Sequence, residues 1–133
     1  MYALDTNIII HLLQNTPNVC QKFDNAVMAE EAKIVIPPYV NFEILRGFRY
    51  VSAPRKEKTY KQLCNNCDIG EMNRDIWECA AEIYANLRRA HFTVEDADIL
   101  VAAFSVKNGY KLVTGNTKDF ENIVGLQIVN WTK

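Results

Sequence analysis

The residues of this sequence with the clearest capacity for chemistry are carboxylates in apolar surroundings. Asp5 lies between two apolar runs in MYALDTNIII, Glu43 lies within VNFEIL, and Asp98 precedes the run ILVAA. An unpaired buried carboxylate costs several kcal/mol, so each acid needs strong hydrogen-bond donors or a cation. No lysine or arginine is adjacent to Asp5 or Asp98. Because the donors are oxygens, the sequence favours a Mg²⁺ or Mn²⁺ site over a zinc site.

Short apolar segments alternate with helical segments, and these elements must position the acids. Strands are expected at residues 2–4, 33–36, 67–69, 111–114 and 126–129, with a turn at 115–119. Helices are expected at 8–14, 19–31, 37–49, 57–65, 73–89 and from a capping box at Thr93–Asp96 to Asn108; Thr6 or Asn7 is the expected cap of the first. This alternation predicts one α/β domain over residues 1–133, with a mostly parallel sheet covered on both faces.

The acids fall near one edge of such a sheet. Asp5 directly follows the first strand, Glu43 lies in the helix after the second strand, and Asp119 follows the fourth. Asp96 and Asp98 lie in the first turn of the helix that precedes the fourth strand. Ligands of open α/β sheets bind at the carboxyl ends of the strands. Clustered carboxylates repel one another, and a divalent cation bound among them removes that penalty.

Four ordered motifs carry these acids: LDTN at 4–7, EILRG at 43–47, DADILVAA at 96–103 and LVTGNTKDF at 112–120. Together with the ending GLQIVNW at 125–131, they resemble the motifs of PIN-domain ribonucleases, most closely the VapC-type toxins of toxin–antitoxin pairs. The resemblance covers nearly the whole chain. It implies a PIN-like three-layer α/β/α sandwich and a Mg²⁺-dependent endoribonuclease that hydrolyses RNA phosphodiester bonds, with Mn²⁺ as the expected substitute for Mg²⁺.

The resemblance also implies a role for each acid. Asp5, Glu43 and Asp98 match the first three catalytic acids of the family, and Asp96 is an extra acid that some members have. Helix capping explains Asp96 equally well. The fourth position departs from the family pattern, because many relatives have an acid where this chain has an amide. Asp119 is expected to supply that charge, or else is a plain turn residue.

In the implied mechanism the metal lowers the pKa of a bound water and neutralises charge on the phosphate. The implied metal ligands are Asp5, Asp98, Asp96 and Asp119. Glu43 is expected to position or deprotonate the attacking water, or to complete the metal shell. Thr6 and Asn116 are expected to hold the carboxylates in register. The sequence leaves open whether one or two metal ions bind.

A basic segment at residues 46–61 holds six cations and one acid, with aromatic side chains interleaved. Cations and stacking rings together suit single-stranded RNA. The RNA-binding residues expected here are Arg46, Arg49, Arg55 and Lys56. A solvated helical hairpin with packed aromatic residues explains the same pattern equally well.

Composition excludes few function classes. The 15 Lys+Arg and 16 Asp+Glu residues give a net charge of −1, which argues neither for nor against nucleic acid. No apolar run has the length of a membrane span, and no signal-like segment opens the chain, so a cytoplasmic protein without a membrane partner is expected. Four cysteines are consistent with free thiols in a reducing compartment.

The resemblance implies three partners: an RNA substrate such as a tRNA or rRNA loop, a cognate antitoxin, and a second copy of the chain in a homodimer. Two other classes stay open. A phosphoacceptor receiver domain also has acids at strand ends, but it needs paired acids after its first strand, where this chain has Asp5 alone. A catalytically silent PIN scaffold that only binds a partner protein is compatible with the amide at Asn116.

Overall fold

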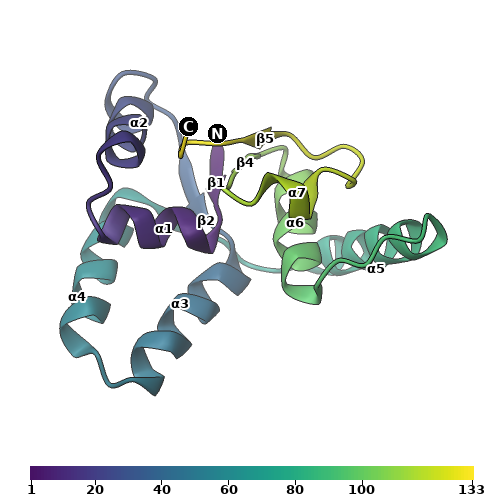
Figure 1. Ribbon diagram of the computed structural model, residues 1–133, viewed down its shortest axis with the longest axis horizontal. Coiled ribbons are helices and arrows are strands. Elements are labelled where there is room, and N and C mark those ends of the chain that lie inside the picture. The colour runs from purple at the N-terminus through teal and green to yellow at the C-terminus, as the bar shows by residue number, and fades with distance from the viewer.

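The computed structural model describes residues 1–133, and its centre is a parallel sheet of five short strands (Figure 1). The strands are β1 (Tyr2–Leu4), β2 (Ile34–Ile36), β3 (Asp68–Ile69), β4 (Lys111–Val113) and β5 (Ile128–Val129). They lie in the order β3-β2-β1-β4-β5, and every neighbouring pair is parallel. The predicted α/β class with a mostly parallel sheet is confirmed.

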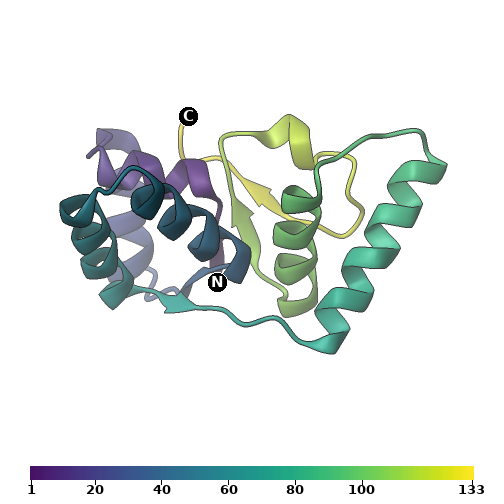
Figure 2. The ribbon, with the colours of Figure 1, turned by 90° about the horizontal axis from the view of Figure 1, so that it is seen from below.

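Helices cover both faces of the sheet and complete the predicted three-layer α/β/α sandwich. One face carries α1 (Thr6–Leu13), α2 (Pro17–Met28), α3 (Pro38–Tyr50) and α4 (Pro54–Leu63). The other carries α5 (Arg74–Arg89), α6 (Asp96–Asn108) and the short α7 (Thr117–Phe120), as Figure 2 shows. A 3₁₀ turn, η1 (Cys64–Asn66), follows α4. Right-handed crossovers explain the division, because the chain builds the sheet in one direction from β1 to β3 and then resumes at β4 on the opposite side of β1. No helix has both the length and the apolar character to cross a membrane.

The two central strands, β1 and β4, form the point where the strand order reverses. Leu4 pairs with Val113 across them, so Asp5 and Thr114 leave the sheet side by side. In open parallel sheets, ligands bind beyond the carboxyl ends of the strands at such a switch point. Asp5 therefore lies where the topology favours a ligand.

The helix that carries Asp98, α6, is enclosed by its neighbours and packs against α5, α3 and β4. Its buried residues are distributed all around its axis: Ile99, Val101, Ala102, Ala103, Phe104 and Ser105. A helix that is apolar on all sides belongs in the interior. Gly109 ends it with a φ of 69°, the left-handed C-terminal conformation that glycine adopts without strain. The packing fixes the position from which Asp98 projects.

Two predicted caps are wrong. Asp5, rather than Thr6 or Asn7, caps α1, because its carboxylate accepts the backbone N–H of Thr6 at 2.8 Å. The capping box expected at Thr93–Asp96 does not form, since Glu95 is the residue that precedes α6 and no side chain caps that helix. In both places an acid occupies the position directly before the helix, where the sequence pattern predicts a hydroxyl or amide side chain.

Several predicted boundaries also differ. α4 begins at Pro54 instead of residue 57, because proline is well suited to the first turn of a helix. The turn expected at 115–119 contains α7, and β5 has two residues where four were expected. Short elements at the edge of the sheet depend on tertiary contacts more than on local pattern, which explains these differences.

Candidate active site

Asp5 is the only buried acid of the chain, with 7% of its surface exposed at the junction of β1 and α1. Its Oδ1 accepts the Thr6 backbone N–H, and its Oδ2 accepts the Asn7 side-chain amide at 3.0 Å and the Thr114 hydroxyl at 2.8 Å. Burial raises the pKa of Asp5 and the nearby Glu43 carboxylate adds to the rise, while the hydrogen bonds oppose it. Asp5 is thus a rigidly held carboxylate.

Thr114 and Asn7 join the ends of β1 and β4 around this acid. The fully buried Thr114 hydroxyl donates to Asp5 and accepts the Asn7 amide at 3.2 Å and the Asn116 backbone N–H at 3.0 Å. It therefore uses its one proton and both lone pairs. The Asn7 carbonyl oxygen accepts the Gly115 N–H at 2.8 Å, and a Cβ on Gly115 would lie only 3.3 Å from that oxygen. Glycine permits this close approach of the backbone.

Thr114 is a site residue that sequence reasoning missed, and the expected contact of Asn116 is not formed. The exposed Asn116 side chain donates to none of the acids, and only its backbone takes part through Thr114. A signal for Thr114 existed, since it follows β4 as Asp5 follows β1. This signal can be interpreted only when β1 and β4 are known to be neighbouring strands.

Glu43 lies on α3 and is held between two partners. The Thr6 hydroxyl donates to its Oε1, and the Arg46 guanidinium lies 3.6 Å from its Oε2. Arg46 in turn lies against the rings of Phe42 and Tyr39, at 5.1 and 6.0 Å from their centroids. The Glu43 side chain stays 32% exposed, so its carboxylate is accessible to solvent while its position is defined.

Asp98 is half-buried in the first turn of α6, and its pKa is raised to about 6. Burial is the largest cause, followed by repulsion from the carboxylates of Asp5, Asp119, Glu43 and Glu95. No hydrogen bond or cation opposes the rise. The acids that contribute to this rise come from the end of β1, from α3, from the residue before α6 and from α7.

Asp119 and Glu95 lie beside Asp98. With Asp98 they line a hollow between the start of α6 and α7, and Lys118 is the one cation in that lining. Asp119 comes from the first turn of α7 and is exposed. Glu95 was missed because the sequence pattern treats it as an interior member of a capping box. A helix in place of the predicted turn brings Asp119 to the hollow.

Asp96 is separated from this group. It is exposed and lines an adjoining hollow with Tyr39, Tyr84 and Arg88, to which Glu95 also contributes. Residues two apart on a helix do not share a face, so Asp96 and Asp98 point to different sides of α6. The structure gives Asp96 no capping bond and no place among the repelling acids, and it retains only a favourable charge at the start of the helix.

These acids fit Mg²⁺ through their chemistry and electrostatics, not through a closed cage. No three His, Cys, Asp or Glu side chains lie close enough together to hold a metal ion by themselves. Mg²⁺ keeps several water ligands and is usually bound by one or two carboxylates, so it does not require such a cage. Asp98 has a raised pKa and no cationic partner, which is the condition that a divalent cation relieves.

The residues expected to bind RNA fall into two groups. Arg46 faces Glu43, and Arg49 lies 3.3 Å from Glu57, so both cations already have an acidic partner. Arg55 and Lys56 have none, and they line a pocket between α1, α3 and α4. The unneutralised positive charge of the hairpin is therefore concentrated at the start of α4.

Comparison with known proteins gives this arrangement a context. The chain matches the PIN domain over residues 2–126. It is 24% identical over 134 residues to Ribonuclease VapC1 of Haemophilus influenzae (strain R2866), a match that covers 100% of this chain and 99% of that protein. It is 25% identical over 133 residues to the tRNA(fMet)-specific endonuclease VapC of Shigella flexneri, covering 98% of each.

Solved structures show the same fold. VapBC2 of Rickettsia felis, determined bound to a DNA fragment from the promoter, has a chain that superposes with a TM-score of 0.90 at 21% identity and covers 98% of both chains. VapBC-1 of nontypeable Haemophilus influenzae superposes with a TM-score of 0.87 at 24% identity, over 99% of this chain and 98% of the other. At these identities the likeness shows the fold alone.

Proposed function

The chain belongs to the PIN-domain family, and on that premise we propose that it is a Mg²⁺-dependent endoribonuclease that acts as the toxin of a toxin–antitoxin pair. Its full-length curated relatives are named as VapC ribonucleases or endonucleases. The observation that carries the proposal is that Asp98 and Asp119 line one hollow and that no cation pairs with Asp98, whose pKa is raised by burial and by four other carboxylates.

The residues that would hold the metal are Asp98, Asp119 and Asp5. When bound, Mg²⁺ lowers the pKa of a coordinated water and neutralises charge on the phosphate. Asp98 and Asp119 line the same hollow and have no side-chain partners there. Mn²⁺ has the same preference for oxygen ligands and would substitute. Without the cation, the repulsion among these acids also disfavours the approach of a phosphodiester.

Asp5 contributes mainly through one of its oxygens. Its Oδ2 accepts two hydrogen bonds and has no lone pair left, whereas its Oδ1 accepts only the Thr6 N–H. A carboxylate has about four lone-pair sites, so one position on Oδ1 remains for a ligand. The bonds from Asn7 and Thr114 fix the direction of that position.

Glu43 is the candidate for accepting a proton from the attacking water. The Thr6 hydroxyl fixes one of its oxygens, and the other faces the half-exposed Arg46. A base that is oriented on one side and accessible on the other is suited to proton transfer. Arg46 is positioned to leave Glu43 and pair with a phosphate of the bound RNA, since guanidinium groups bind phosphate in the same geometry as carboxylate.

The proposal includes two protein partners. The similar structures from Rickettsia felis and Haemophilus influenzae are named as VapBC complexes, which supports an antitoxin as the partner of this chain. We also propose that the chain forms a homodimer and that its substrate is a tRNA or rRNA loop. The relative from Shigella flexneri is named for one tRNA, which supports the RNA class.

The test is cleavage of purified cellular RNA by the protein in Mg²⁺, in Mn²⁺ and in EDTA. We expect cleavage with either cation and none in EDTA, and loss of cleavage in the Asp98→Asn protein. Asp24→Asn is the matched control, because Asp24 is an exposed acid on α2. Sequencing of the cleaved ends identifies the RNA and the bond.

Equal cleavage by the Asp98→Asn and Asp24→Asn proteins would contradict the proposed site. Absence of cleavage of any RNA, together with binding of an antitoxin, would instead support a catalytically silent PIN scaffold.

A further inference from the structure

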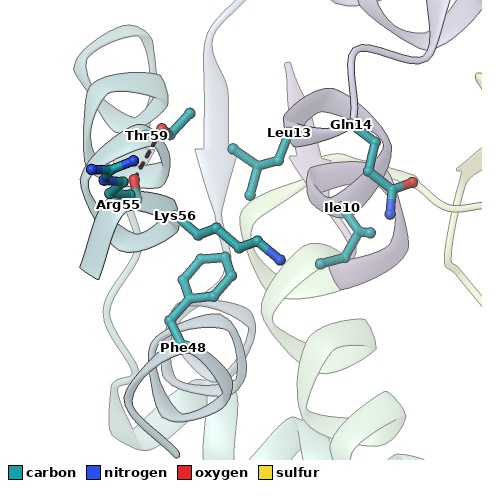
Figure 3. A pocket seen from close by; sticks show the side chains of 7 residues that line it. All are labelled: Ile10, Leu13, Gln14, Phe48, Arg55, Lys56 and Thr59. Atoms are coloured by element: carbon teal, nitrogen blue, oxygen red, sulfur yellow. Dashed lines mark hydrogen bonds between the residues drawn. The ribbon is translucent and has the colours of Figure 1, made fainter. Parts of the chain in front are cut away.

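We propose that the pocket between α1, α3 and α4 binds one base of the RNA substrate, a few nucleotides away from the bond that is cleaved. The inference rests on the proposed ribonuclease function and adds a place where the substrate is recognised. Figure 3 shows the pocket, which encloses about 250 Å³. Sites for drug-sized ligands enclose roughly 300–1,000 Å³, so this pocket suits a smaller flat group such as a single base.

The floor of the pocket is apolar and includes one aromatic ring. Ile10 and Leu13 approach from α1, and the Phe48 ring approaches from α3, as Figure 3 shows. The buried Tyr60 packs edge-on against Phe48, with ring centroids 6.4 Å apart, and the Tyr60 hydroxyl donates to Asn41 at 2.8 Å. Phe48 is therefore a fixed ring at a partly exposed position, which is the arrangement of a stacking platform.

The rim of the pocket is polar and positive. Arg55, Lys56 and Gln14 also line the pocket, and Figure 3 shows the Lys56 side chain lying across it from α4 towards Ile10 of α1. The only acid of α4, Glu57, is occupied by Arg49 at 3.3 Å and Lys61 at 3.2 Å. Arg55 and Lys56 consequently keep their full charge for phosphates, while the Gln14 amide offers both a donor and an acceptor to a base edge.

The pocket lies close to the acids of the candidate active site, here called the acidic edge: Asp5, Glu43, Asp98 and Asp119. Asp5 precedes α1, and Ile10 and Leu13 follow it on the same helix, roughly 7 and 12 Å further along at 1.5 Å per residue. Stacked nucleotides rise about 3.4 Å each along one strand, so a few nucleotides cover this distance. α3 spans the same interval from Glu43 to Phe48. A strand whose phosphate lies at the acids can therefore place a neighbouring base in the pocket.

RNA accounts for the combination of features better than a peptide does. An apolar peptide segment would explain the floor but not two unpaired cations at the rim, and an acidic segment would not need an aromatic floor. An RNA strand uses both features, because its bases stack on an aromatic ring and its charged phosphates pair with cations.

The test measures RNA binding by fluorescence polarisation in Mg²⁺, with every variant made in the Asp98→Asn protein to prevent cleavage. The probes are a short labelled single-stranded RNA of mixed sequence and an abasic oligomer with the same number of phosphates. We expect Phe48→Leu to weaken RNA binding roughly 5- to 100-fold, the range of one lost stacking contact, and to leave abasic binding unchanged. The Phe48→Trp protein, which keeps an aromatic ring at this position, should bind RNA as the parent does.

Matched controls come from the same hairpin. Tyr50, at the end of α3, is 90% exposed and outside the pocket, so Tyr50→Leu should bind RNA as the parent does. Lys56→Gln should weaken binding of both probes and lower the salt dependence by about one counterion, with a smaller effect from Lys58→Gln, outside the pocket. Lys56 and Lys58 are exposed, so these two variants keep the test valid if Phe48→Leu does not fold.

Three results decide the outcome, and the first and third separate this inference from the proposed function. If the native protein cleaves RNA but Phe48→Leu binds RNA as tightly as Tyr50→Leu, the base pocket is wrong and the ribonuclease stands. If the native protein neither cleaves nor binds RNA, both are wrong. Unchanged RNA binding by Phe48→Leu with lost binding of the antitoxin would assign the pocket to the protein partner and overturn the inference.

Discussion

The two sides of the acidic edge are built in different ways. Asp5 and Glu43, the inner pair, each accept hydrogen bonds from side chains that other elements position, namely Thr114 and Asn7 for Asp5 and Thr6 for Glu43. Asp98 and Asp119, the outer pair, line an open hollow, and nothing offsets the repulsion on Asp98.

The difference indicates that the two pairs of acids have different roles in stability and activity. The fold uses hydrogen bonds to fix the inner pair, so loss of an inner contact damages the structure as well as the site. Asp98 in the outer pair carries a repulsion that a bound cation would relieve, so its loss should stabilise the free protein while it weakens the proposed metal site. Activity and stability should therefore change together on one side and in opposite directions on the other.

The largest expected effect is that of Asp5→Ala. If Asp5 binds the metal as we propose, its loss removes several kcal/mol of transition-state stabilisation, so RNA cleavage should fall on the order of 1,000-fold. The change also removes the cap of α1 and the acceptor of two side chains, so the free energy of unfolding should fall by about 2 kcal/mol. Cleavage assays and urea unfolding measure the two quantities.

Growth arrest by expression of the chain alone gives an independent readout and should disappear in Asp5→Ala. Arrest that persists with Asp5→Ala at equal protein levels would contradict the role of Asp5.

A second expected effect concerns Thr114→Val, which keeps the shape of the side chain but removes the hydroxyl. The Asn116 N–H, the Asn7 amide and Asp5 each lose a partner, so the free energy of unfolding should fall by about 1–3 kcal/mol. Cleavage should fall roughly 10- to 100-fold, as for other residues that orient metal ligands. Thr59→Val is the control for the unfolding measurement, since the exposed Thr59 hydroxyl donates only to a backbone carbonyl of its own helix. Equal unfolding curves for the two variants would show that the inner pair does not depend on Thr114.

The outer pair gives a smaller effect with an opposite sign. An aspartate has a pKa of about 3.9 when unfolded, and Asp98 has a pKa of about 6 in the fold, so the folded state binds the proton more tightly. Stability from this group is present below about pH 4 and is lost as the pH rises through about 6. In EDTA at pH 7.5, Asp98→Asn should be more stable than the native protein by about 1–2 kcal/mol, after allowance for solvent screening.

Unfolding of the native and Asp98→Asn proteins at pH 4 and pH 7.5 measures this difference, and the comparison cancels groups with opposite shifts, such as Glu57. The two curves should coincide at pH 4. Mg²⁺ at pH 7.5 should stabilise the native protein only. A native protein that is more stable than Asp98→Asn in EDTA at pH 7.5 would show that the outer pair is satisfied within the fold.

The parts of this site that the sequence predicts are those set by local pattern. Asp5 and Asp98 stand out because a charge interrupts an apolar run, and the strand-end rule is enough to place both at one edge of the sheet. Thr114 could not be found in this way, because its partner is set by the pairing of β1 with β4, which are more than a hundred residues apart in sequence.

The basic hairpin of α3 and α4 shows the same limit of prediction from local sequence pattern. The sequence gives equal weight to an RNA track and to a solvated hairpin, because both predict alternating cations and rings. In the structure Arg49 and Lys61 form ion pairs with Glu57, whereas Arg55 and Lys56 line a pocket formed with α1. Which cations are free depends on how α3 and α4 pack, and local pattern does not contain that information.

The smallest expected effect tests whether Asp96 acts together with the outer pair. Asp96 lies two residues from Asp98, belongs to the same motif and was predicted as a further metal ligand, yet it points to another face of α6 and has no part in the repulsion on Asp98. Asp96→Asn should therefore retain cleavage within about twofold and change the free energy of unfolding by no more than about 0.5 kcal/mol, the usual range of a surface substitution. The Mg²⁺ concentration that gives half-maximal cleavage is the more sensitive measurement, since loss of a ligand would raise it roughly 10-fold or more. An unchanged value would limit the outer pair to Asp98 and Asp119, whereas a raised value would extend it around the start of α6 and would require Asp96 to turn towards the hollow when the metal binds.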